Sequence, residues 1–242
     1  MLEVNGLSKR FGGFLAVNQV SFELRAGEIL GLIGPNGSGK STTFNLIAGT
    51  LRPSSGSIRF EGKEIAGLPA HAICHQGVGR TFQIPRPFRK LSLLENVTLA
   101  AYYGEAGGIS RSEAEHRAAE ALDMVGLPSD RSASTNGLGA AALKKLELAR
   151  ALATKPRLLL ADESLNGLDH GEMESAADML QRIRREKNIT IVWVEHIMGV
   201  LMRVVDRVVV LDHGEVIFSG PPKEAQDNAR VVEVYLGAEA HA

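Results

Sequence analysis

Apolar residues along the chain fall into short uninterrupted runs separated by longer amphipathic stretches. Runs of strand length occur at residues 28–33, 157–163, 189–194, 207–211 and 216–219. Uninterrupted apolar strands are typical of a sheet that is buried on both faces. Helical periodicity follows them at 41–48, at 170–186 and in the stretch that ends at Val204. This alternation predicts an α/β fold built on a mixed, mainly parallel sheet.

Two other patterns add smaller parts to this core. Residues 2–7 and 17–24 alternate between apolar and polar positions, and 56–65 predicts a hairpin with Glu61-Gly62 in the turn. These segments predict an N-terminal antiparallel β-subdomain. A short helix is expected from 69 to about 76, followed by a strand at 79–83 that ends in Gln83.

The stretch from about 88 to 153 is mainly helical in pattern. Helices are expected at 92–103, 111–125 and 140–153, with Gly107-Gly108 and residues 128–139 between them. We therefore divide the chain into a core with the β-subdomain (about 1–87 and 154–220), a helical subdomain (about 88–153) and a C-terminal tail (about 221–242), which Pro221-Pro222 opens.

Composition narrows the classes of function. The 242 residues carry 27 Lys plus Arg against 28 Asp plus Glu, so no global basic field attracts nucleic acid or an anionic membrane. The one cysteine, Cys74, excludes an internal disulfide, which agrees with a reducing cytosol. The apolar runs are far shorter than the roughly 18 to 20 residues that span a bilayer, so a membrane function would require another chain.

The first candidate chemistry is a phosphate loop. Residues 34–41 form a complete G-x-x-x-x-G-K-S motif between the strand 28–33 and the helical stretch 41–48, which Thr42 continues: Gly34, Pro35, Asn36, Gly37, Ser38, Gly39, Lys40 and Ser41. Glycines let backbone N–H groups approach a polyphosphate, and the helix directs its positive end at the same anion. Lys40 would reach the β- and γ-phosphates, and Ser41 would place its hydroxyl on Mg²⁺. The motif predicts binding of ATP or GTP.

A pair of carboxylates, Asp162 and Glu163, ends the apolar run at 157–163. Parallel sheets carry their chemistry at the carboxyl ends of their strands. We expect Asp162 to hold Mg²⁺ together with Ser41, and Glu163 to act as the general base or to polarise water. His71, Cys74 and His75 share one helical face but lack a fourth ligand nearby, which disfavours a metal site there.

Taken together, these motifs resemble those of the ATP-binding subunits of ABC transporters over essentially the whole chain. The matching elements are Phe11, the phosphate loop (Walker A), Gln83, the Walker B strand 158–163, the D-loop 166–169 and His196. The resemblance implies ATP and Mg²⁺ as cofactors. Spacing alone favours Phe11 as a cap of the small sheet over a purine-stacking aromatic, and the resemblance makes it the aromatic that stacks on adenine. It also implies that Gln83 senses Mg²⁺ or the attacking water and that His196 contacts the γ-phosphate.

Within this family, the sequence is most similar to the branch that takes up branched-chain or hydrophobic amino acids. The segments 79–83, 88–92, 95–97, 194–198 and 234–237 carry this similarity. It implies permease subunits, a second ATP-binding subunit in a nucleotide-sandwich dimer, an indirect link to a substrate-binding protein, and a place on the cytoplasmic face of the membrane. Residues 84–100, with Pro85, Pro87 and Phe88 expected to be exposed, would receive a permease helix. Export of lipopolysaccharide, import of urea or amides, and a role outside transport are the alternatives.

The sequence departs from the family at the signature segment. The family pattern Leu-Ser-Gly-Gly-Gln is replaced by Leu138-Gly139-Ala140-Ala141-Ala142. Gly139 stands where a serine would donate to a partner's γ-phosphate, and Ala141 adds a methyl group where backbone must approach phosphate. Since helix N-terminal N–H groups remain, we expect weakened anion binding at this segment.

Overall fold

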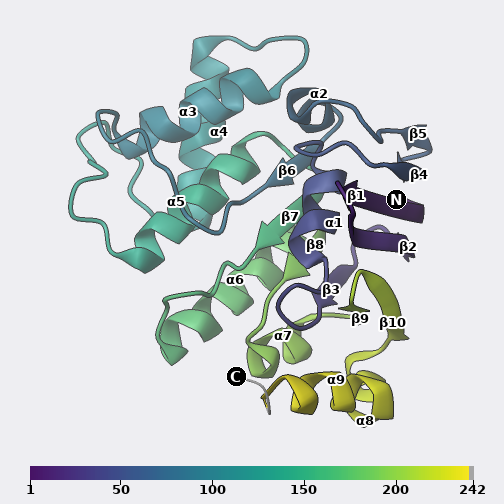
Figure 1. Cartoon of the computed structure of the whole chain (residues 1–242). Helices are drawn as coiled ribbons and strands as arrows, with labels where there is room; N and C mark the ends of the chain where they lie inside the picture. The colour runs from purple at the N-terminus through teal and green to yellow at the C-terminus, as the bar shows by residue number, and fades with distance from the viewer. Residues whose placement is uncertain (240–242) are drawn as a thin grey trace. The chain divides into compact units, whose positions relative to one another are not determined.

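The computed structural model describes residues 1–239, with the side chains of 236–239 excepted, and divides the chain into two compact units. One unit contains residues 1–73 and 190–242, and the other contains residues 74–189. Figure 1 shows the course of the chain. The last three residues of the predicted tail, 240–242, lie outside the described part.

The first unit holds an antiparallel sheet of order β2-β1-β4-β5, with β1 (Leu2–Phe11), β2 (Phe14–Leu24), β4 (Ser55–Phe60) and β5 (Lys63–Glu64). Leu2 pairs with Leu24 on one side and with Phe60 on the other. All three side chains are buried, so the alternation of the sequence places the apolar face inward. The expected hairpin turn lies at Glu61 and Gly62, both at positive φ.

A second set of strands in this unit runs in the order β10-β9-β3-β8. These are β3 (Ile29–Ile33), β8 (Thr190–Val194), β9 (Arg207–Asp212) and β10 (Glu215–Gly220). β3 is parallel to β8 and β9, and β10 returns antiparallel. A Cβ on Gly31 would lie 3.0 Å from the Leu201 side chain and 3.2 Å from that of Val208. Glycine therefore permits close packing on β3.

The helices of this unit are α1 (Lys40–Ile47), α2 (Ala70–His75, which crosses into the second unit), α7 (Met198–Val204), α8 (Pro222–Asp227) and α9 (Ala229–Glu239). Figure 1 shows α8 and α9 next to each other beside β10. The helical tail expected after Pro221-Pro222 is thus present, and Pro222 occupies the first helical position, where its missing N–H costs nothing.

The second unit joins a short parallel pair of strands to four helices. Its strands are β6 (Val78–Arg80) and β7 (Leu158–Asp162), and its helices are α3 (Leu93–Gly104), α4 (Arg111–Met124), α5 (Ala140–Ala153) and α6 (His170–Lys187). Helices α3, α4 and α5 pack against one another (Figure 1). Small residues at Ala114, Ala118 and Ala149 are buried and allow this packing.

The predicted α/β class, with a mixed sheet, an N-terminal antiparallel sheet and a helical part, is confirmed. Two expected strands are longer than the observed ones. The strand expected at 79–83 ends at Arg80, and Pro85 and Pro87 in the segment beyond it lack the N–H groups that a strand ladder needs. The strand expected at 157–163 ends at Asp162, because Glu163 adopts a φ of +40°. Phe11 ends β1.

Candidate nucleotide site

The phosphate loop connects β3 to α1 through three glycines at positive φ. Gly34, Gly37 and Gly39 have φ values of +149°, +81° and +101°. A Cβ on Gly34 would lie 2.1 Å from the Leu211 carbonyl oxygen, and one on Gly39 would lie 2.7 Å from that of Ala16. The backbone around the loop thus excludes any side chain at these two positions.

Lys40 is buried at the start of α1, with 8% of its surface exposed. Its Nζ donates to the carbonyl oxygens of Gly34 and Pro35, both at 2.8 Å. The Ser38 hydroxyl is buried and has no hydrogen-bond partner among the described residues. The first turn of α1 contains no acidic residue, so nothing there opposes the positive end of the helix dipole. A cation, a free hydroxyl and a helix N-terminus fit a polyphosphate.

Ser41 and Thr42 follow Lys40 in the first turn of α1, Ser41 exposed and Thr42 half-buried. Asn36 and Gly37 are exposed at the tip of the loop, and a Cβ on Gly37 would meet no atom within 4 Å. The tip is therefore open to solvent. An exposed hydroxyl beside an anion cradle suits a Mg²⁺ ion carried by the bound phosphates.

Phe11 and His196 are the other predicted residues in this unit. Phe11 ends β1 with 46% of its surface exposed, and the Lys9 ammonium lies 5.0 Å from the centre of its ring. His196 is exposed between β8 and α7, directly after the buried Glu195. Both side chains are thus exposed to solvent.

The second unit brings Gln83, Asp162 and Glu163 together. Gln83 Nε2 and Asn166 Nδ2 both donate to Glu163 Oε2, the latter at 2.9 Å. Asp162 pairs with Arg80 at 3.1 Å, and its backbone N–H donates to the Thr81 hydroxyl at 3.1 Å. Burial raises the pKa of Asp162, and the Arg80 guanidinium opposes that rise. Two adjacent carboxyl groups therefore have different partners.

The sequence did not single out Arg80, which pairs with the Asp162 carboxylate, or Lys144, which contacts the backbone beside the carboxylate pair. Arg80 lies opposite Leu160 in the parallel pairing of β6 with β7, two positions before Asp162. Lys144 Nζ donates to the backbone oxygens of Gln83 and Glu163. The register of the two strands could have indicated Arg80, but no local pattern indicates the contacts of Lys144.

Comparison with known proteins identifies the family. Residues 17–166 match the ABC transporter family, and residues 215–241 match the C-terminal region of branched-chain amino acid ATP-binding cassette transporters. The chain belongs to the ABC transporter ATPases. It is 38% identical to the high-affinity branched-chain amino acid transport ATP-binding protein LivG of Salmonella typhimurium and 37% identical to BraF of Pseudomonas aeruginosa, each over 98% of both chains.

Solved structures agree with this assignment. An ATP-binding cassette of an ABC transporter in its ADP conformation superposes with a TM-score of 0.87 at 28% identity over 98% of both chains. A dimeric cassette bound to ADP and phosphate superposes with a TM-score of 0.81 at 28% identity over 92% of this chain and 99% of the other. The predicted ATPase subunit of an ABC transporter is thus confirmed, with ATP as the nucleotide of this ABC ATPase.

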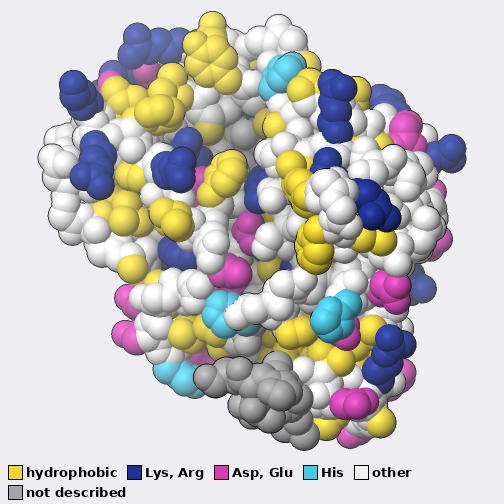
Figure 2. Space-filling view, viewed as in Figure 1, with side chains coloured by type: hydrophobic (Ala, Val, Ile, Leu, Met, Phe, Trp, Pro, Cys, Tyr) yellow, Lys and Arg dark blue, Asp and Glu magenta, His cyan; other side chains and the backbone are white. Residues whose placement is uncertain are grey.

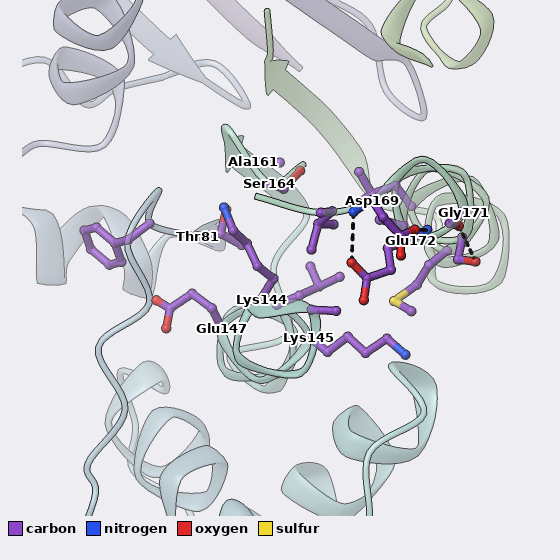
Figure 3. Close-up of a pocket in the computed structure, with 17 residues that line it drawn as sticks. Thr81, Lys144, Lys145, Glu147, Ala161, Ser164, Asp169, Gly171 and Glu172 are labelled. Carbon is purple, nitrogen blue, oxygen red and sulfur yellow. Dashed lines mark hydrogen bonds between the residues drawn. The ribbon is translucent and has the colours of Figure 1, made fainter. Parts of the chain in front are cut away.

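The divergent signature segment begins helix α5 of this ABC ATPase. Gly139 is the N-cap residue, and no side chain caps the helix there. A Cβ on Gly139 would meet no atom within 4 Å, whereas Ala141 lines a cavity of about 390 Å³. This cavity lies between α5 and α6 and reaches the Thr81 side chain (Figure 3). A serine side chain would therefore have room at residue 139, and its replacement by glycine removes a hydrogen-bond donor.

The D-loop, residues 166–169, leads into α6 in the same unit. Asp169 caps α6 reciprocally with Glu172: the Glu172 N–H donates to Asp169 Oδ1 at 2.8 Å, and the Asp169 N–H donates to Glu172 Oε2 at 3.0 Å. Figure 3 shows this pair at the wall of the cavity. The cap fixes the end of the segment that carries Asn166, a partner of Glu163.

Apolar side chains are exposed along the segment that follows Gln83. Ile84 and Phe88 are 67% and 49% exposed, but Pro85 and Pro87, which we expected to be exposed, are half-buried. A groove of about 430 Å³ lies along α3 and is lined by Leu94, Leu99 and Tyr103 among others. Figure 2 shows apolar side chains interspersed with lysines and arginines on this part of the ABC ATPase. No helix within residues 1–239 is long and apolar enough to span a bilayer.

Proposed function

We propose that this ABC ATPase powers an importer for branched-chain or other hydrophobic amino acids. The observation that carries the proposal is the similarity to LivG and BraF over 98% of the chain, joined to the separate C-terminal match at 215–241. The cassette would act with permease subunits, a second ATP-binding subunit and, indirectly, a substrate-binding protein. It would sit on the cytoplasmic face of the membrane.

The unit with the phosphate loop would bind the nucleotide. Gly34 to Thr42 would enclose the phosphates with backbone N–H groups, and the Lys40 ammonium would exchange its carbonyl partners for phosphate oxygens. Phe11 would stack on the adenine through its exposed ring face. His196 would contact the γ-phosphate. These four contributions bind and orient ATP before any bond breaks.

The carboxylate pair would provide the chemistry of hydrolysis. Asp162, Ser41 and Gln83 would hold Mg²⁺, which neutralises charge on the phosphates when it is bound. Glu163 would orient the attacking water and accept its proton. Its carboxylate is already directed by the amides of Gln83 and Asn166. Gln83 would thus connect the site to the segment that follows it.

That segment would receive the permease. Residues 84–100 contain the exposed Ile84 and Phe88 and one wall of the α3 groove. Asn96, which is fully buried, holds Phe88 in place: its Oδ1 accepts from the Phe88 N–H at 2.8 Å and its Nδ2 donates to the Phe88 oxygen at 3.1 Å. A rigid apolar residue beside a groove suits a short amphipathic permease helix. Residues 88–153 would form the helical subdomain of the cassette.

Uptake of labelled leucine by the assembled transporter tests this proposal. Wild-type chain should support ATP-dependent uptake, whereas Phe88→Asp should lower it at least about tenfold, because a charge at the centre of an apolar contact is desolvated without a partner. The isolated variant should bind ATP as the wild type does. Leu68→Asp, at a residue 37% exposed in the other unit, is the control.

Two results would contradict the proposal. Normal uptake by Phe88→Asp would show that the permease does not bind at residues 84–100. Uptake of urea or amides but not of leucine, isoleucine or valine by the wild type would leave the ATPase in place and replace the substrate class.

A further inference from the structure

Lys144, in the second turn of α5, contacts two backbone groups that are distant in sequence. Its Nζ donates to the Glu163 carbonyl oxygen at 2.7 Å and to the Gln83 carbonyl oxygen at 3.1 Å. Gln83 precedes Lys144 by 61 positions, and Glu163 follows it by 19. The side chains of the same two residues are hydrogen-bonded to each other. One ammonium group therefore holds the backbone of both members of this pair.

The backbone at Glu163 requires such a restraint. Its φ of +40° lies in the left-handed region, which non-glycine residues rarely adopt. Conformations of this kind persist when surrounding contacts fix them. The Lys144 ammonium fixes the carbonyl group of Glu163, and Asn166 fixes its carboxylate. A charged donor to a carbonyl is among the stronger hydrogen bonds.

The segment after Gln83 depends on α5 as well. Pro85 and Pro87 have no N–H to donate, and residues 81–88 form neither helix nor strand. Arg150, six residues after Lys144 on α5, donates from Nη1 to the Arg86 carbonyl oxygen at 3.2 Å. Two cations of one helix thus hold this irregular segment at two points.

The neighbouring Lys145 provides a contrast. Figure 3 shows Lys144 and Lys145 leaving α5 in different directions, Lys144 toward Thr81 and Lys145 away from it. Both lysines line the same cavity and are half-buried. They match in charge and size and are neighbours on α5, and of the two it is Lys144 that donates to the carbonyl oxygens of Gln83 and Glu163.

We propose that Lys144 is a positioning residue for hydrolysis, which fixes Gln83 and Glu163 by holding their carbonyl groups and so ties the helix of the signature segment to the water-orienting carboxylate. The proposal rests on the function proposed above for Glu163. It requires no contact of Lys144 with nucleotide. Removing the ammonium should therefore slow the chemical step and leave ATP binding intact.

Steady-state hydrolysis by the assembled transporter tests this role. Lys144→Met, which keeps the apolar stem, should lower kcat about 10- to 100-fold, the range expected for a misplaced catalytic group. KM for ATP, and ATP affinity of the isolated chain, should stay within about twofold of wild type. Lys144→Arg should restore most of kcat, and Lys145→Met should match wild type. In a Glu163→Gln background, Lys144→Met should have little further effect.

Amide hydrogen exchange of the isolated full-length chain gives a readout that needs no turnover. Lys144→Met should accelerate exchange in peptides covering 81–88 and 162–166, and Lys145→Met should not. The inference is overturned if Lys144→Met leaves kcat and exchange unchanged, or if ATP affinity falls as much as kcat. Should Glu163→Gln hydrolyse ATP at the wild-type rate while exchange still responds to Lys144→Met, the role of Glu163 fails and the positioning contact stands.

Discussion

Individual glycines of the phosphate loop are required for different reasons. The sequence alone suggests that every glycine makes room for phosphate. The structure assigns this role to Gly37, whose missing Cβ faces open space, whereas Gly34 and Gly39 face carbonyl groups of the protein itself. The motif therefore encodes the packing of the loop onto Leu211 and Ala16 as well as its opening to an anion.

Long-range partners are what the sequence could not provide. Lys40, Asp162 and Glu163 follow from motif spacing, because their positions are set by the strand or loop that carries them. The pairing of Arg80 with Asp162 needs the register of β6 on β7, and the contacts of Lys144 need the packing of α5. Neither is encoded by a local pattern.

A buried ion pair on α5 makes a pH-dependent prediction. Glu147 is 5% exposed and pairs with Arg150 at 2.9 Å. Burial raises the pKa of Glu147, and Arg150 opposes that rise. Arg150→Met should lower the free energy of unfolding at pH 7 by about 1–3 kcal/mol, because it leaves a buried carboxylate without its partner. The loss should shrink as the pH falls, because protonation of Glu147 removes the unpaired charge.

The sign follows from proton binding. With its folded-state pKa above the unfolded value, Glu147 binds more protons in the folded chain between those two values, so stability falls as pH rises through that window. Arg150→Met should raise the upper end of this pH range, because the folded-state pKa of Glu147 rises further without its partner. Urea unfolding at several pH values measures the free energy of unfolding of the wild type and the variant. Arg111→Met, at an exposed ion pair, is the control. An equal loss at pH 7 and pH 5 would contradict this account.

Among the elements, helices were predicted more accurately than strands. The predicted bounds of α5, 140–153, match the structure, and α3 begins after Ser92, whose hydroxyl accepts from the Glu95 N–H. Caps of this kind are local and readable in sequence. The ends of β6 and β7 depend instead on neighbouring strands and on the backbone turn at Glu163, so the sequence extended both too far.

The start of α5 allows a direct test of the signature segment. Gly139→Ser would meet no atom and would supply a cap, which should stabilise the isolated chain by only a few tenths of a kcal/mol. If Gly139 limits hydrolysis in self-associated chain, the same change should raise its ATPase rate at least about threefold, because it adds a donor for phosphate. Ala140→Ser, one residue further on, is the control. An unchanged rate would show that the glycine is not limiting.

Across the whole molecule, the motifs are divided between two compact units, with Lys40 and His196 in one and Asp162, Glu163 and the signature segment in the other. In a nucleotide-sandwich dimer, each site would combine one chain's phosphate loop with the partner chain's signature. The altered residues Gly139 and Ala141 would then weaken the site that contains the partner's phosphate loop. The site that contains this chain's own Glu163 would remain competent if the partner signature is intact.

Hydrolysis of Mg²⁺-ATP by the assembled transporter tests the central claim most directly. Glu163→Gln in this chain should lower the rate at least about tenfold and retain ATP binding, because the amide cannot accept the proton of water. The corresponding change in the partner subunit should cost much less, since that site uses the altered signature. Equal loss from either change would contradict the asymmetry. A wild-type rate with Glu163→Gln would contradict the account of this chain as the catalytic ATPase.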